Sequence, residues 1–367
     1  MRIFIVGGYL RDEYLGITPQ DKDYVVVGSS PQELQAKGFI PIGQDFPVFL
    51  HPKTKEEYAL ARTERKTGQG YKGFTFYASP EVTLEQDLLR RDFTMNAMAQ
   101  EITTDGELIG PLIDPFGGQV DMSQGIIRHV SDAFNEDPLR ILRLARFMAK
   151  FTHFEIANST LELVRQMVQA GELQFLVPER VWQEISRGLM EARPSRMIDV
   201  LVKTQASHTI LPAGLEHDKT LQQTKIYLDT GAQQGLDIQI QLAYLLACIE
   251  LSELDQWTEQ RKIPTDIKNF ARVFHQLHQE NLRTSRSAQE VLSFFNQADA
   301  WRKPERLKKA LLAEQVVGKD IQQWQPLLEA ALAVDAGTIA KNMATGDGSK
   351  IQLAVAASRL QAIAACL

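Results

Sequence analysis

Asp21-Lys22-Asp23-Tyr24-Val25-Val26-Val27 is the stretch that decides the fold of this chain. The run after the aspartates is apolar and β-branched, which predicts a buried strand. Residues two apart on a strand project from the same face, so we expect both carboxylates to meet one site. Two carboxylates without a neighbouring His or Cys suit Mg²⁺, which in such sites also binds phosphates. The alternative is a solvated turn or a helix cap, because Thr18-Pro19-Gln20 precedes the pair.

A glycine pair precedes the aspartates in Val6-Gly7-Gly8-Tyr9-Leu10-Arg11-Asp12. It lies between a predicted strand and a predicted helix, where backbone N–H groups can approach phosphate oxygens with no Cβ in the way. We therefore expect Gly8 and Arg11 to contact a nucleotide. A tight strand-to-helix turn would also need such a pair, but the aspartates that follow favour the phosphate site.

A third carboxylate would complete a two-metal site, and Glu57 is the best placed. It opens Glu57-Tyr58-Ala59-Leu60-Ala61-Arg62, a predicted strand that can lie beside the first. Glu56 points to the opposite face of that strand.

Length and composition limit the class of protein. A chain of 367 residues predicts two or more domains. The net charge of −6 and the pI near 5.7 argue against a protein that coats nucleic acid through bulk positive charge, so contact with nucleic acid must be local. Two cysteines, Cys248 and Cys366, exclude a disulfide framework and a Cys-based zinc site. With no apolar run of membrane-spanning length and no signal-peptide pattern, we expect a soluble, cytoplasmic protein.

The chain predicts an α+β fold, in which an α/β module up to about residue 125 is followed by helices. In the module the predicted elements are strands over Arg2 to Val6 and Tyr24 to Val27, a short helix over Pro31 to Lys37, a hairpin of Phe46 to Leu50 with Glu57 to Arg62, a mobile loop over Thr63 to Ser79, and a helix that starts with a capping box at Thr83-Leu84-Glu85-Gln86. Beyond Asp137, apolar residues recur at helical spacing, which predicts a helical array.

Five motifs follow one another in this chain. They are Gly7-Gly8-Tyr9-Leu10-Arg11-Asp12, Asp21-Lys22-Asp23, Arg90-Arg91-Asp92-Phe93-Thr94-Met95-Asn96-Ala97, Asp114-Pro115-Phe116-Gly117-Gly118-Gln119-Val120-Asp121 and Glu136-Asp137-Pro138-Leu139-Arg140-Ile141-Leu142-Arg143. Each is weak alone, but together and in this order they resemble the class II tRNA nucleotidyltransferases, the CCA-adding enzymes. The resemblance continues through Pro178-Glu179-Arg180-Val181-Trp182 and Asp299-Ala300-Trp301-Arg302-Lys303-Pro304-Glu305-Arg306 and covers most of the chain.

The resemblance implies a domain plan and a reaction. Residues 1–125 would form a polymerase-β-like nucleotidyltransferase head with a mixed sheet, residues 126–205 a helical neck that recognises the base, and residues 206–367 a helical body and tail that bind tRNA. The implied reaction is the template-independent addition of C, C and A to the tRNA 3′ end from CTP and ATP, with release of pyrophosphate.

The resemblance also assigns roles in that reaction. Asp21 and Asp23 would hold two Mg²⁺ ions, bind the triphosphate and activate the tRNA 3′-hydroxyl for in-line attack on the α-phosphorus. Arg91 would contact the nucleotide near its sugar, and Asp92 and Asn96 would order the same pocket. Without the resemblance, these three residues also fit a capped helix with an ordinary Arg–Asp pair.

Asp137, Arg140, Arg143 and Arg146 recur every three residues and predict a polar stripe on one helix. Cytosine and adenine both present an exocyclic amine donor beside a ring-nitrogen acceptor, and uracil and guanine reverse this pattern. An acidic acceptor next to an Arg donor can therefore accept C and A and refuse U and G. The resemblance makes Asp137 and Arg140 this protein template and Arg143 a further nucleotide ligand. Intrahelical salt bridges are the alternative.

The Thr63 to Ser79 segment bears on how many nucleotides are added. In the resembled family, variants that add only two C residues have a shortened flexible loop at this point. Here the loop is long and follows Arg62, with Glu64, Arg65 and Lys66 retained, which favours addition of all three nucleotides.

Many bacterial relatives carry a C-terminal His-Asp phosphohydrolase domain, whose metal site we expect to be lost here. The one His-Asp dipeptide, His217-Asp218, is predicted at a loop or helix start, and Leu246-Ala247-Cys248-Ile249-Glu250 stands where relatives place the metal-binding pair. His275 and His278 are predicted to be surface or packing histidines.

Basic residues gather late in this acidic chain, and we expect them to contact the phosphates of tRNA. Without the resemblance, a solvated helix face explains them equally well. The set is Arg283, Arg286, Arg302, Lys303, Arg306, Lys308 and Lys309.

Four other functions stay open at this stage. A poly(A) polymerase or a CC-adding enzyme shares the head motifs, although a polymerase of varied RNA would need a broader basic surface. A tRNA-binding quality-control protein with an inactive head is the non-enzyme alternative, against which the intact Asp21, Asp23 and Arg140 argue. A metal phosphohydrolase lacks its ligands. Oligomeric state is not predicted.

Overall fold

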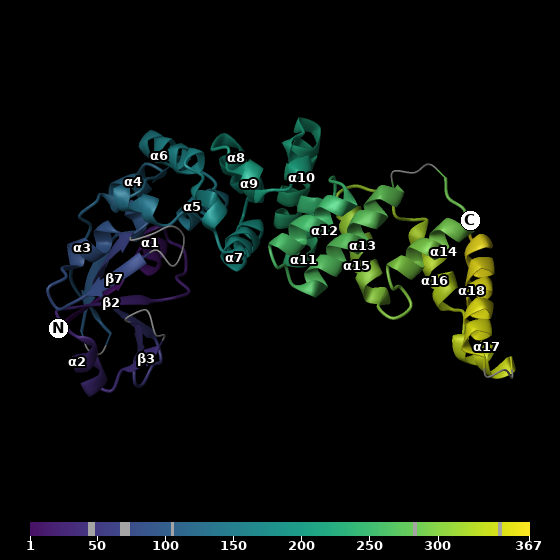
Figure 1. Cartoon of the computed structure of the whole chain (residues 1–367), viewed down its shortest axis with the longest axis horizontal. Coiled ribbons are helices and arrows are strands. Elements are labelled where there is room, and N and C mark those ends of the chain that lie inside the picture. Colours follow the sequence, from purple (N-terminus) through teal and green to yellow (C-terminus); the bar gives the residue numbers. More distant parts are fainter. Residues whose placement is uncertain (43–47, 67–73, 104–105, 282–284, 344–346) are drawn as a thin grey trace. The chain divides into compact units, whose positions relative to one another are not determined.

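The computed structural model describes residues 1–42, 48–66, 74–103, 106–281, 285–343 and 347–367. These residues form two compact units, Met1–Val181 with Asp199–Ile210 and Trp182–Ile198 with Leu211–Leu367. The strands lie in the first unit, drawn from purple to teal, and the second unit is helical, with Trp182–Ile198 drawn in teal and Leu211–Leu367 in green to yellow (Figure 1). The expected order of a mixed-sheet module followed by helices is confirmed. The finer division into head, neck, body and tail stays a prediction.

A mixed sheet forms the centre of the first unit, with strand order β3-β4-β5-β2-β1-β8-β9. Only β2 and β5 are parallel among these neighbours; the other pairs are antiparallel. The strands are β1 (Arg2–Val6), β2 (Asp23–Val27), β3 (Ile40–Ile42), β4 (Val48–Leu50), β5 (Glu57–Leu60), β8 (Ala99–Ile102) and β9 (Leu108–Ile113).

The apolar runs in Arg2–Val6 and Asp23–Val27 form the inner strands β1 and β2, because an inner strand has a neighbouring strand on each side and can bury its apolar side chains. Phe4, Val6 and Val25 belong to one buried cluster. Val6 pairs with Asp23, so the end of β1, where the glycine pair begins, lies beside the start of β2. The sheet thus brings the two first sequence motifs together.

The prediction of a loop from Thr63 to Ser79 is partly wrong. It contains two antiparallel strands, β6 (Arg62–Lys66) and β7 (Phe74–Ala78), and residues 67–73 between them lie outside the described part of the chain. Both arms contain Thr and the second contains two Phe and a Tyr, which favour strands. The Gly and Lys content of the centre concealed these arms.

The helices of the first unit include the two that the sequence predicted. Ser30 caps α2, and Thr83 caps α3 with the expected capping box. The elements are α1 (Gly8–Tyr14), α2 (Pro31–Ala36), α3 (Leu84–Leu89), η1 (Thr94–Asn96), α4 (Gly118–Ser123), η2 (Asp132–Glu136), α5 (Leu139–Lys150), α6 (Asn158–Gln169), η3 (Glu172–Phe175) and α9 (Ser207–Ile210), with a small parallel pair of β10 (Ile126–Ile127) and β11 (Glu155–Ile156).

The second unit is built from packed helices, and its apolar stripes face one another. α11 packs on α10 and α13, α13 on α15, and α18 on α14 and α16. The helices are η4 (Ala213–Glu216), α10 (Asp218–Gln233), α11 (Ile238–Leu246), α12 (Leu251–Gln260), α13 (Thr265–Asn281), α14 (Ala288–Gln297), α15 (Pro304–Val316), α16 (Trp324–Leu332), α17 (Ala336–Asn342) and α18 (Gly348–Ala364), while α7 (Pro178–Leu189) and α8 (Pro194–Lys203) divide between the units. Among the described residues, no helix combines the length and apolar character needed to cross a membrane.

Candidate active site

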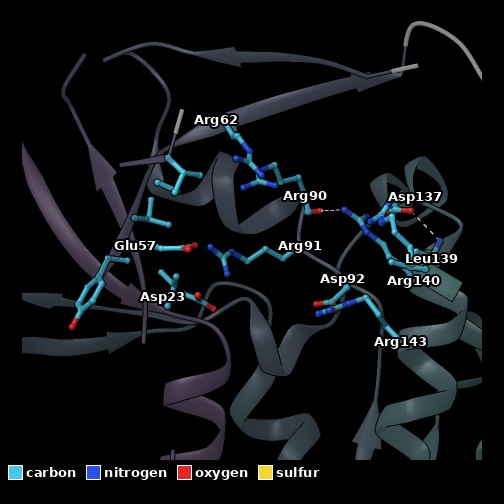
Figure 2. A pocket seen from close by; sticks show the side chains of 16 residues that line it. Asp23, Glu57, Arg62, Arg90, Arg91, Asp92, Asp137, Leu139, Arg140 and Arg143 are labelled. Carbon is cyan, nitrogen blue, oxygen red and sulfur yellow. Dashed lines mark hydrogen bonds and ion pairs between the residues drawn. The ribbon is translucent and has the colours of Figure 1, made fainter. Parts of the chain in front are cut away.

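A cavity of about 520 Å³ opens in the first unit at the end of the sheet where β2 and β5 begin. Figure 2 shows Asp23, Glu57 and Arg91 pointing toward one another in it, with Asp137, Arg140 and Arg143 on the side of α5. Six arginines face four carboxylates, so the cavity suits an anion with several charges. The charged lining residues are Asp23, Glu57, Asp92 and Asp137 with Arg62, Arg90, Arg91, Arg140, Arg143 and Arg180.

The glycine turn lets two charged side chains approach the backbone closely. Gly7 has φ +72°, in the left-handed region that side chains other than glycine rarely adopt. A Cβ there would lie 3.1 Å from Arg91 Nη1 and 4.0 Å from Asp23 Oδ2. The turn therefore lies beside Arg91 and Asp23, which both line the cavity, and Gly8 begins α1.

The two aspartates are not equivalent. Asp23 opens β2 and lines the cavity, whereas Asp21 lies exposed in the loop before the strand. The expectation that both project from one strand face is wrong, because the turn residues before Asp21 delay the start of the strand. Glu57 lies on β5 next to Asp23, since Tyr24 pairs with Tyr58 in parallel register. Glu56 turns away and accepts a hydrogen bond from Tyr24.

The carboxylates of the cavity fit a hard divalent cation in part. Among the described residues, no group of three or more His, Cys, Asp or Glu side chains is arranged to hold a metal ion. Asp23 and Glu57 nevertheless both face the cavity. Mg²⁺ commonly takes one or two carboxylates and completes its shell with phosphate oxygens and water, so this donor set fits Mg²⁺ bound together with a triphosphate.

Arg91 is fixed from behind by a carboxylate that sequence reasoning missed. Asp87 on α3 accepts from Arg91 Nη2 at 3.2 Å and from Arg90 Nη2 at 2.9 Å. Burial opposes ionisation of Asp87, but Arg90 and Arg91 outweigh it and lower its pKa. Its spacing of three and four residues from two arginines at the C-terminal end of α3 was the available signal.

Asp92 connects the cavity to α1 through a short chain of hydrogen bonds. It accepts from Arg143 Nη2 at 2.6 Å and from Asn96 Nδ2 at 3.0 Å, and Asn96 Oδ1 accepts from Arg11 Nη1 at 2.8 Å. Burial raises the pKa of Asp92, but Arg143 and the Asn96 hydrogen bond outweigh it, so the pKa falls to about 2. Asp92 is thus an anion that orders Arg143 and Asn96.

Arg11 is enclosed by the protein. Its guanidinium contacts Asp12 at 2.7 Å and lies over Phe147 and Phe151, and the residue is 6% exposed. It does not line the cavity, so in this arrangement Arg11 supports Asn96.

The predicted base readers lie where α5 begins. Asp137 precedes the helix in extended conformation, because Pro138 follows it, and its Oδ1 accepts from the backbone N–H of Leu139. The expectation of a place on the helical stripe is therefore wrong for Asp137, although Arg140 is one turn away. Arg140 donates to the carbonyls of Ala133 and Arg90, each at 2.6 Å.

Arg180 is a second residue that sequence reasoning left without a role. It comes from the start of α7, lines the cavity and donates to Asp137 Oδ2 at 3.0 Å. The Pro178-Glu179-Arg180 segment was part of the resemblance, and this was the only signal for it.

The late basic residues differ in exposure. Arg302, Lys303 and Lys308 are exposed. Arg286 is buried against Trp324, Arg306 donates to the Ala298 carbonyl, and Lys309 contacts Asp237. Arg283 lies outside the described residues.

Two histidines of the second unit, His275 and His278, bind protein groups. His217 precedes α10, as expected for a helix start. His275 and His278 are both buried; His275 Nε2 contacts the Ile249 carbonyl and His278 Nδ1 contacts Glu314 Oε1, each at 2.7 Å. They are packing histidines and not surface ones.

Two family models match the chain. Residues 3–128 match the poly A polymerase head domain, and residues 153–216 match the probable RNA and SrmB-binding site of polymerase A. The first match contains the glycine turn, Asp23, Glu57 and Arg91.

Curated relatives match over the whole chain. The chain is 44% identical to the multifunctional CCA protein of Burkholderia lata, covering 100% of this chain and 99% of the relative. It is 47% identical to the CCA-adding enzyme of Bordetella pertussis, covering 99% and 96%.

Solved structures show the same fold. A CCA-adding enzyme in complex with CTP is 22% identical and has a TM-score of 0.65, covering 99% of this chain and 87% of that one. A CCA-adding enzyme in complex with ATP is 23% identical and has a TM-score of 0.67, covering 99% and 86%.

Proposed function

The chain belongs to the family of CCA-adding enzymes, the tRNA nucleotidyltransferases, and on that premise we propose that it adds C, C and A to the 3′ end of tRNA. CTP and ATP are the substrates, and pyrophosphate leaves. The observation that carries the proposal is one cavity that combines Asp23 and Glu57 with Arg91 on one side and Asp137 with Arg140 on the other.

The carboxylate side performs the transfer. Asp23, with Glu57 beside it and Asp21 in the preceding loop, would hold Mg²⁺, which when bound neutralises triphosphate charge and activates the attacking 3′-hydroxyl. Arg91 binds the nucleotide next to these groups. The Gly7-Gly8 turn leaves room for it, because a side chain at Gly7 would meet the Arg91 guanidinium.

The α5 side selects the base. Asp137 accepts from the exocyclic amine of C or A, and Arg140 donates to the ring nitrogen. Arg180 aligns Asp137, and the Ala133 and Arg90 carbonyls align Arg140. Uracil and guanine present the reverse pattern to this pair and are refused.

The tRNA body binds through exposed cations of the second unit. Arg302, Lys303 and Lys308 are exposed and suited to phosphate contact. Arg286, Arg306 and Lys309 are held by protein groups and support this surface from within. The expected cytoplasmic location stays a prediction.

One extension assay tests the proposal. A tRNA transcript without its terminal CCA is incubated with the protein, Mg²⁺ and each NTP singly, then with CTP and ATP, and products are resolved at single-nucleotide length. We expect growth by three nucleotides and then a halt. A long A ladder would identify a poly(A) polymerase, two additions a CC-adding enzyme, and no extension a tRNA-binding protein.

A further inference from the structure

Asp87 is a fully buried carboxylate behind the nucleotide cavity. It lies on α3 and is 0% exposed, so no substrate atom can reach it. A buried carboxylate is costly unless hydrogen bonds and positive charges compensate it, and all compensation for Asp87 comes from residues that line the cavity.

Three cavity residues converge on this carboxylate. Oδ2 accepts from Arg91 Nη2 and Nε at 3.2 and 3.4 Å. Oδ1 accepts from Arg90 Nη2 at 2.9 Å and from the backbone N–H of Arg62 at 3.2 Å. The paired donors of Arg91 fix the plane of its guanidinium, whose Nη1 faces the glycine turn.

The same carboxylate reaches the base-selecting side through Arg90. The Arg90 side chain donates to the carbonyl of Arg62 at 3.1 Å, and the Arg90 carbonyl accepts from Arg140 at 2.6 Å. Hydrogen bonds therefore run without a break from the first residue of β6 through Asp87 and Arg90 to Arg140.

We propose that Asp87 is the positioning residue of the nucleotide site: it aims Arg91 into the cavity and ties the base of the β6–β7 hairpin to the residue that supports Arg140. It contacts no substrate and acts through the arginines. The proposal rests on the proposed function, because that function is what makes Arg91 a nucleotide ligand.

A double-mutant cycle tests the link to Arg91. Asp87→Asn preserves shape and removes the charge, and we expect it to raise KM for CTP and ATP about tenfold. Arg91→Ala should cost at least as much. If Asp87 acts through Arg91, the double variant matches Arg91→Ala within about twofold. Multiplied single effects, or an unchanged KM in Asp87→Asn, would overturn the proposal.

Asp121→Asn is the matched control. Asp121 is also a buried carboxylate of the first unit that binds an arginine, accepting from Thr94 at 2.7 Å and Arg128 at 3.1 Å, and it does not line the cavity. We expect it to lower the thermal unfolding midpoint and leave KM within about twofold. An equal rise of KM in both variants would mean that Asp87 is merely structural.

Two provisions keep the test decisive. If Asp87→Asn does not fold at 15 °C, Asp87→Glu replaces it, because this variant keeps the charge and displaces Arg91 by one methylene. An unchanged KM in Asp87→Glu overturns the proposal. A KM that is raised in Asp87→Glu, but is not raised further when Asp87→Glu is added to Arg91→Ala, supports it. Calorimetric CTP binding to all variants is measured alongside extension. Wild-type protein that binds CTP without extending tRNA defeats the proposed function, while the binding cycle still decides the role of Asp87.

Discussion

The first and second units each contain a buried carboxylate with a short hydrogen bond, Asp92 beside the cavity and Glu314 in a polar cluster. The two differ in whether the hydrogen-bond partner of the carboxylate faces a cavity. Asp92 binds Arg143 at 2.6 Å, and Arg143 lines the cavity. Glu314 binds His278 at 2.7 Å and Asn281 at 2.9 Å, and Trp324 closes the cluster by donating to Asn281.

The difference separates two uses of the same chemistry. A buried charge whose partner faces a cavity leaves that partner's other donors available to a ligand. A cluster that satisfies itself contributes only to stability and to the choice of one packing. We therefore expect changes at the cavity to alter catalysis with little effect on unfolding, and changes at the Glu314 cluster to do the reverse.

Asp23→Ala should have the largest effect. Removing a group that acts in the transfer itself costs on the order of ten-thousandfold in rate. Asp23 is exposed, so its loss should leave the unfolding midpoint and tRNA affinity nearly unchanged. Single-turnover extension and filter binding measure the two quantities. Asp21→Ala is the companion: an equal loss would assign the loop carboxylate to the metal, and retained activity would remove it from the site.

Glu314→Gln should destabilise the second unit. Breaking a buried pair by removing one partner's charge costs about 3 kcal/mol of unfolding free energy. Urea unfolding measures this loss, and extension at low temperature should stay normal. The control is Glu305→Gln, which changes an 80% exposed side chain paired with Lys308 and should stay within about 0.5 kcal/mol. If Glu314→Gln loses activity while its unfolding free energy is unchanged, the expected contrast between the cavity and the Glu314 cluster is wrong.

His278 makes the stability of the second unit depend on pH. Burial opposes its charge, but hydrogen bonds with Cys248 and Glu314 outweigh it and raise its pKa from 6.5 to about 9. Because the folded pKa is the higher one, the stabilisation is complete below pH 6.5 and is lost as pH rises through 9, by about 3 kcal/mol at most. Urea unfolding between pH 6 and 9.5 should show this decline, and His278→Gln should flatten it. If stability declines equally with pH in His278→Gln, the pH dependence arises from another titrating group.

The sequence predicted those parts of the site that local pattern determines. Apolar β-branched residues predicted β2. The alternation of side chains along the strand that begins at Glu57 predicted that Glu57, and not Glu56, would lie near Asp23. The capping box at Thr83 predicted the start of α3 correctly. These features depend on neighbours a few residues away.

The missed parts depend on tertiary contacts. Asp87 is spaced three and four residues from Arg90 and Arg91, which is a local signal, but its complete burial depends on tertiary packing and could not be predicted from the sequence. Arg286 reads as a phosphate ligand, and only packing against Trp324 shows that it is enclosed. Asp137 lies outside its helix because Pro138 restricts it, a local signal that the three-residue periodicity obscured.

Arg140→Ala should alter choice more than speed. Losing one well-placed donor to a base costs about tenfold in discrimination. We expect misincorporation of UMP or GMP to rise about tenfold relative to CMP and AMP in single-nucleotide assays. Arg146→Ala is the control, because Arg146 lies on the same helix and stacks on Phe147 without lining the cavity. Unchanged selectivity in Arg140→Ala would remove it as a base reader.

The exposed cations of the second unit should have the smallest effects, and they extend the comparison to single charges. Arg302→Ala, Lys303→Ala or Lys308→Ala should each weaken tRNA binding about two- to threefold and reduce the dependence of log Kd on log salt by about one ion, because each neutralised phosphate releases a counterion. Arg286→Ala is the enclosed counterpart: its side chain is 5% exposed, so it should lower stability and leave the salt dependence unchanged. Arg286→Ala could instead reduce the salt dependence as the exposed variants do. In that case the exposure of a cation in the second unit does not decide whether it binds tRNA phosphate or only stabilises the fold.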